Sequence, residues 1–148
     1  MGTPAFERYG QEEEQIFENI TFIYMFDEKQ IELLEKFQIR TKYETEPPHG
    51  DPIYSISLKD KEFPFWIYGR NIVFIGETKV MVEAVKPNTW AQGGINTVII
   101  DTKKNMYARF KNWYRDISIK DNQIKLTNRY EEIEEILGGF DELEWIAL

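Results

Sequence analysis

The chain has 148 residues, a length typical of one domain, and we expect residues 1–148 to form a single domain. With 42% hydrophobic and 15% aromatic residues, the sequence can form a core and is not composed like a disordered protein. The absence of cysteine excludes disulfides and thiolate metal sites, and no apolar run approaches the ~20 residues that a membrane helix needs. The amino terminus lacks a basic start and an apolar stretch, so we expect a cytoplasmic protein with no membrane partner.

The net charge of −8 is distributed unevenly along the chain. Residues 1–35 carry nine acidic and two basic residues, and residues 130–148 carry seven acidic residues and no basic one. Residues 101–129 carry eight basic and three acidic residues. This layout predicts either neutralisation of the basic segment by the acidic ends within the fold, or an anionic surface suited to a cationic partner.

The first elements predicted along the chain are a helix ending near Asn19 and a buried strand, "ITFIYMF", over residues 20–26. Residues 27–38 then predict a helix. Asp27 and Gln30 have the spacing of a capping box, and apolar residues recur after them at helical spacing.

Residues 52–127 predict a succession of antiparallel strands. "PIYSISLKD" alternates as a strand does, and Pro64 in "EFPFWIYG" restricts the next strand to a sheet edge or a bulge. "RNIVFIGE" and "TKVMVEAV" meet at a short turn, and residues 120–123 form a polar turn between two isoleucine-rich segments, which predicts a hairpin.

The last predicted element is a helix over residues 128–137, "NRYEEIEEIL", with Asn128 as its cap and Gly138-Gly139 as its stop. Strands in the middle and helices toward both ends together predict an α+β fold. We expect an antiparallel sheet of about five to seven strands, with helices near the N- and C-termini.

The stretch "PPHGDP" contains His49, the only histidine of the chain. A catalytic histidine needs a nucleophile or an orienting carboxylate, and Asp51 is the nearest candidate in sequence. Two prolines before the histidine and Gly50-Asp51-Pro52 after it are typical of a turn. We therefore interpret this stretch as structural and expect His49 to be dispensable.

The carboxy-terminal acids support the main functional prediction, a non-enzymatic protein-binding or inhibitor domain that engages a cationic protein partner through an acidic surface. Acidic side chains steer the encounter with a cationic protein, and aromatic residues anchor the complex. In composition alone the chain resembles immunity proteins against nuclease toxins and phage antagonists of host enzymes. The predicted partner-binding residues are Glu131, Glu132, Glu134, Glu135, Asp141, Glu142 and Glu144.

A first alternative is the binding or sequestration of a small nucleotide-class anion by the basic and aromatic strip of residues 103–115. Basic residues interleaved with aromatic ones are typical of nucleotide binding, whereas the net charge opposes long nucleic acids. The glycine-containing loop 88–96 adds a stacking tryptophan. The residues of this alternative are Trp90, Lys103, Lys104, Arg109, Lys111, Trp113 and Arg115.

A second alternative is a metal-dependent enzyme that uses carboxylates. Glu77, Glu83 and Asp101 lie in the strand-rich region, but the chain has no phosphate loop, no dinucleotide fingerprint, no nucleophile elbow and no zinc signature. We therefore name no catalytic residue, metal or cofactor.

Overall fold

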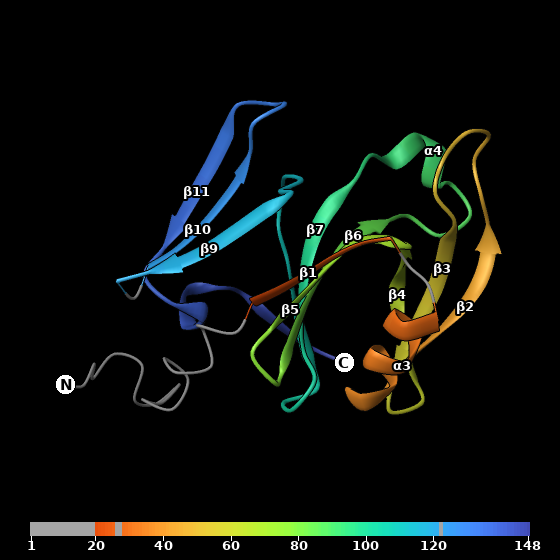
Figure 1. The fold of residues 1–148 in the computed structure, drawn as a ribbon, viewed down its shortest axis with the longest axis horizontal. Coiled ribbons are helices and arrows are strands. Elements are labelled where there is room, and N and C mark those ends of the chain that lie inside the picture. The colour runs from red at the N-terminus through yellow and green to blue at the C-terminus, as the bar shows by residue number, and fades with distance from the viewer. Residues whose placement is uncertain (1–19, 26–27, 122) are drawn as a thin grey trace.

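The computed structural model describes residues 20–25, 28–121 and 123–148. Within these ranges the chain is mainly antiparallel β-structure in two sheets, of nine and three strands (Figure 1). The larger sheet contains β1 (Ile20–Met25), β2 (Ile39–Thr45), β3 (Ile53–Leu58), β4 (Lys61–Tyr68), β5 (Arg70–Ile75), β6 (Lys79–Val85), β7 (Asn96–Asp101), β8 (Met106–Arg109) and β12 (Trp145–Ala147). The smaller sheet contains β9 (Asp116–Lys120), β10 (Gln123–Asn128) and β11 (Ile133–Leu137). The helical segments are α3 (Glu28–Lys36), α4 (Trp90–Gly93) and the 3₁₀ turn η1 (Phe140–Glu142).

The larger sheet divides at β6. One edge of β6 pairs with β7, and the sheet continues from there to β8 and β12. On the other edge, residues 79–81 pair with β5, which continues to β1, whereas Ala84 and Val85 pair with β4, which continues to β3 and β2. The two groups of strands therefore diverge from the two halves of β6 (Figure 1).

The strands around this branch are buried on both faces. Every residue of β6 is buried, as are most residues of β5 and β7. Val80 and Val82 belong to one hydrophobic cluster, and Met81 between them belongs to the other, as expected when successive side chains of a strand point to opposite faces. Short, continuous apolar runs such as "IVFI", residues 72–75, are the sequence pattern of such strands.

The helix α3 covers the first of these clusters. Leu34 is buried there, and Leu33 and Phe37 pack against the cluster. The predicted helix over residues 27–38 is therefore confirmed for Glu28–Lys36, whereas its predicted capping residue Asp27 lies outside the described residues. Figure 1 shows α3 between the β1–β5 strands and the β2–β3–β4 strands. Gln38, with φ 64°, turns the chain into β2 directly after the helix. No helix in the described part of the chain has the length and apolarity to cross a lipid bilayer.

The smaller sheet covers the second cluster, on the other side of β5, β6 and β7 (Figure 1). Apolar side chains from all three of its strands point inward, and the chain after β8 and the 3₁₀ turn contribute aromatic rings. The buried residues of this cluster are Val73, Ile75, Met81, Ile99, Phe110, Tyr114, Ile117, Ile124, Leu126, Leu137 and Phe140.

The prediction of a helix over residues 128–137 is wrong, and with it the α+β class with helices at both ends. Residues 133–137 form β11, which pairs antiparallel with β10. The described residues instead form a mainly antiparallel β fold, and α3 is their one helix longer than a single turn. The larger sheet alone has nine strands, against about five to seven predicted from the number of apolar segments.

The error has a physical reason. Ile133 and Leu137 point toward the core, whereas Glu134 and Ile136 are exposed, so the segment alternates as a strand. The same isoleucines also fit a helical stripe, and a short segment with both patterns takes the form that its neighbours can pair with. Here five residues of β10 pair with β11, and the inward side chains of β11 pack into the second cluster.

The predicted hairpins are confirmed, with Ile119 opposite Ile124 and Phe74 opposite Val80. The interruption predicted at Pro64 is present as well, since the pairing of β3 with β4 loses its regular register between Ser55 and Ser57. The strand β2 was not predicted. The predicted helix that ends near Asn19 lies outside the described residues.

Candidate functional site

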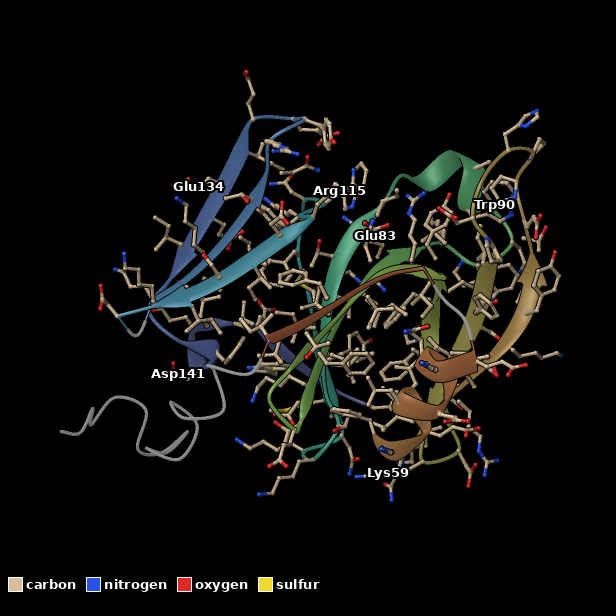
Figure 2. All side chains as sticks on the ribbon, in the orientation of Figure 1. Lys59, Glu83, Trp90, Arg115, Glu134 and Asp141 are labelled. Atoms are coloured by element: carbon tan, nitrogen blue, oxygen red, sulfur yellow. The ribbon has the colours of Figure 1, made fainter. Side chains whose placement is uncertain are left out.

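The seven predicted partner-binding acids lie along and beside β11. Glu131 and Glu132 are in the turn between β10 and β11, and Glu134 and Glu135 are within β11. The remaining three lie in and just after the 3₁₀ turn that follows β11. Figure 2 shows Glu134 and Asp141 on the side of the molecule that the smaller sheet occupies. We call β11 together with Glu131, Glu132, Asp141, Glu142 and Glu144 the acidic edge.

Three of the seven carboxylates have partners within the fold. Glu134 forms an exposed ion pair with Lys125 at 3.4 Å. Glu135 points to the inner face and accepts a hydrogen bond of 2.8 Å from the Tyr114 hydroxyl. Glu142 accepts a hydrogen bond of 2.9 Å from the backbone N–H of Gly138. These contacts hold β11 in place, and they show that the acids do not form one helical face.

The other four carboxylates are exposed and make no ion pair or hydrogen bond to any residue that the structure describes. They are Glu131, Glu132, Asp141 and Glu144. Two lie before β11 and two lie after it, so free negative charge is present near both ends of the strand. An exposed carboxylate without a cationic neighbour keeps its field available for a partner.

Burial and hydrogen bonding both act on the tyrosine that holds Glu135. Burial raises the pKa of the Tyr114 hydroxyl, and its hydrogen bond to Glu135 raises it further, while the amide of Asn112 opposes the rise. The net pKa of Tyr114 lies above its ordinary value. The hydroxyl therefore stays protonated and continues to donate to Glu135 at neutral pH.

Asn128, predicted as a helix cap, organises the turn before β11. Its side chain is buried, donates to the carbonyl of Trp113 at 3.1 Å and accepts from the N–H of Tyr130 at 3.1 Å. Glu132 in the same turn has φ 54°. Asparagine side chains that bond to the backbone two residues later are typical of tight turns, and this bond fixes where Glu131 and Glu132 emerge.

The strand β11 is an edge of the smaller sheet. It pairs with β10 along one side, and no described residue pairs with its other side (Figure 1). Ile136 lies on this strand with 52% of its surface exposed. An unpaired strand edge presents N–H and C=O groups to which another chain can add as a further strand.

The predicted basic and aromatic strip does not form one surface. Lys103 and Lys104 lie in the turn after β7, where their N–H groups bond to Asp101, and Arg109 lies 5.5 Å from the ring of Phe65. That ring belongs to the first cluster, whereas Phe110 belongs to the second. Arg109, the last residue of β8, and Phe110 after it therefore face opposite clusters, which separates Arg109 from the rest of the strip.

Trp113 and Arg115 are the two members of the strip that the structure brings together, with the guanidinium of Arg115 5.7 Å from the Trp113 ring. Lys111 is exposed in the segment before them. Trp90 lies in α4, and Figure 2 shows it well apart from Arg115.

Two of the three carboxylates considered for metal-dependent catalysis have structural partners, and the third, Glu77, is exposed in the turn between β5 and β6. Buried Glu83 accepts hydrogen bonds from Arg70, Asn71 and Trp113. Asp101 lies 3.8 Å from the ammonium group of Lys79, and both side chains are buried. Among the described residues, no three acidic or histidine side chains come together as a metal site would need.

His49 lies in the turn between β2 and β3, exposed and with φ 58°. The N–H of Gly50 bonds to the carbonyl of Pro47 at 3.0 Å, which closes this turn. Asp51, its nearest acid in sequence, instead lies 3.3 Å from Arg70. The dispensability of His49 remains a prediction.

Sequence reasoning missed the open edge of β11, the exposed Ile136 and the role of Asn128. The alternation from Ile133 to Leu137 was the signal that indicated a strand. Whether a strand lies at an edge depends on strand order, which one sequence does not reveal.

Comparison of the chain with protein-family models, with curated proteins and with solved structures finds no match.

Proposed function

We propose that the protein is a non-enzymatic binding protein that engages a cationic protein partner through the acidic edge. The observation that carries the proposal is an open strand edge within a highly acidic segment. Residues 130–148 include seven acids and no lysine or arginine, and β11 lies among them with one side unpaired by any described residue.

Each part of the edge has a distinct role in this binding. The free carboxylates near both ends of β11 attract and orient a cationic segment before contact. An extended segment of the partner then adds as a fourth strand beside β11, and its backbone N–H and C=O groups bond to the open edge. Ile136 supplies an apolar contact on the outer face of the smaller sheet, where it is half-exposed.

A capture experiment with charge-reversed variants tests the proposal. The edge variant changes the four free acids to lysine: Glu131→Lys, Glu132→Lys, Asp141→Lys and Glu144→Lys. The matched control changes four exposed acids elsewhere by the same total charge: Glu32→Lys, Glu35→Lys, Glu62→Lys and Glu77→Lys. Wild type and control are expected to capture the same cationic protein from a lysate, and the edge variant is expected not to capture it. Roughly 0.5 M salt should release the captured protein, because exposed charges are screened within a few Å at that salt concentration.

The binding rates of that protein give the decisive comparison. The edge variant is expected to associate at least about tenfold more slowly than wild type at low salt, because steering depends on the summed local charge. If edge variant and control associate equally slowly, only the net charge matters, and the proposal is wrong.

A further inference from the structure

A polar hollow of about 250 Å³ lies at the junction of three chain segments. These segments are the start of β5, the residues that lead into β9, and the turn after β10. Its lining residues are Asn71, Arg115, Asp116, Arg129 and Tyr130. In the view of Figure 2, Arg115 and Glu83 are both labelled in the region between the two sheets. We call these five residues the arginine hollow. It adjoins the start of the acidic edge, because Arg129 and Tyr130 lie in the same turn as Glu131 and Glu132.

Two guanidinium groups converge in this hollow on one exposed ring. Arg115 lies 5.2 Å and Arg129 lies 5.7 Å from the ring centre of Tyr130, which is 68% exposed. Neither arginine forms an ion pair with a carboxylate among the residues that the structure describes. Aromatic rings orient guanidinium groups but do not neutralise their charge. Two positive charges therefore remain available to a ligand.

Buried side chains hold the walls of the hollow from behind. Glu83, with 3% of its side chain exposed, accepts 2.8 Å and 3.1 Å hydrogen bonds from Trp113 and Asn71. Glu83 also bonds to Arg70 at 2.7 Å, so its charge is compensated by Arg70 rather than by Arg115. The Trp113 ring, fixed in this way, is one of the two rings that orient Arg115. The arginine is thus positioned before any ligand arrives.

A larger hollow of about 580 Å³ lies between the end of α3 and the turn after β3, and its cationic side chains, unlike those of the arginine hollow, have polar partners within the fold. There Arg40 is paired with Asp60 at 3.6 Å. The ammonium group of Lys59 is held by the carbonyl of Thr102 and the side chain of Asn105, both at 2.8 Å. Its cationic groups are already engaged within the fold.

We propose that the arginine hollow binds a small molecule through a single phosphate group. Guanidinium groups match phosphate oxygens in geometry and charge, and Asn71 adds an amide beside them. Asp116 on the lining and the net charge of −8 oppose a ligand with several phosphates or a nucleic-acid strand. The hollow is also smaller than the ~300–1,000 Å³ of most pockets that enclose a whole small molecule. The phosphate is bound, and the rest of the ligand remains largely outside.

The test uses inorganic phosphate, adenosine 5′-monophosphate and adenosine as probes in a titration followed by amide chemical shifts. Phosphate and the monophosphate are expected to shift the amides of the arginine hollow, and adenosine is not. Arg115→Gln and Arg129→Gln are each expected to weaken phosphate binding at least about tenfold, because each removes a charge-assisted contact. Arg109→Gln is the matched control, since it removes an arginine of the same basic segment on the other face of the sheet, and it is expected to leave binding unchanged.

Three outcomes would overturn the proposal. The first is the absence of shifts in the arginine hollow when phosphate is added to wild type. The second is an equal loss of binding in Arg109→Gln, which would indicate attraction by net charge alone. The third is adenosine binding as tightly as its monophosphate. Because Arg129 is exposed, its variant keeps the test valid even if Arg115→Gln lowers stability.

Discussion

The two sheets of this protein differ in how much of each strand the core contains. In the larger sheet, β6 is buried along its whole length and packs against a cluster on either face. In the smaller sheet, each strand buries one face and exposes the other, and β11 leaves one edge unpaired by described residues. We infer that the larger sheet supplies most of the stability and that the smaller sheet carries the surfaces available for binding. Variants in the two sheets should therefore separate stability from binding.

The largest expected effect is at the branch of the larger sheet. Glu83 lies in β6 between the residues that pair with β5 and those that pair with β4, and its side chain holds three donors. Glu83→Ala leaves the guanidinium of Arg70 half-buried and without this partner, and is expected to lower the free energy of unfolding by about 3–5 kcal/mol. Chemical denaturation measures the change. A loss below about 1 kcal/mol would show that the branch does not depend on this network.

The next effect compares apolar truncations in the two sheets. Ile99 in β7 is fully buried, and Ile99→Ala is expected to cost about 3–4 kcal/mol through lost burial and a cavity. Ile119 in β9 is partly buried, and Ile119→Ala is expected to cost about 1 kcal/mol. Equal losses in denaturation experiments would contradict the unequal roles of the two sheets.

A smaller effect is expected at the junction of Tyr114 with β11. Tyr114→Phe removes the hydrogen bond to Glu135 and is expected to cost about 1–2 kcal/mol at neutral pH. The pKa of Tyr114 is raised in the folded state, so the stability linked to its proton is present below about pH 10 and is lost as pH rises through the raised pKa. Wild type should therefore lose more stability than Tyr114→Phe between neutral and strongly alkaline pH. Parallel losses in pH-dependent unfolding curves would contradict this linkage.

The smallest effect on stability is expected at the outer face of β11. Ile136→Ser should change the free energy of unfolding by no more than about 0.5 kcal/mol, because half of the side chain is already exposed. The same variant should weaken partner binding by about 1–2 kcal/mol, whereas Ile146→Ser, at a similarly exposed residue of β12, should not. A stability loss as large as that of Ile99→Ala would show that Ile136 belongs to the core.

Local sequence patterns correctly predicted the segments whose apolar residues fit either a helical period or a strand period, but not both. The helix after residue 27 and the hairpins around residues 76–79 and 120–123 are present, because each combines a clear period with turn-forming residues. The segment from Ile133 to Leu137 satisfied both periods, and its pairing with β10 decided between them. Sequence alone therefore favoured the wrong fold class.

The candidate sites were predictable in residue type but not in arrangement. The acidic residues were identified from charge, yet Glu135 and Glu142 hold β11 in place rather than facing a partner. Arg129 and Tyr130 were not selected, because their approach to Arg115 depends on the turn after β10. Convergence of residues from separate strands is set by sheet order, which a single sequence does not encode in any local pattern.

The most direct test of the proposed function is amide hydrogen exchange of β11 with and without the captured cationic partner. If the partner adds as a strand to the open edge, amides of residues 133–137 that face away from β10 should become at least about tenfold more protected, since they gain backbone hydrogen bonds. The outer strand β2 provides an internal reference that should not change. Unchanged exchange in β11, with protection appearing at β2 or at the arginine hollow, would contradict the acidic edge as the binding site.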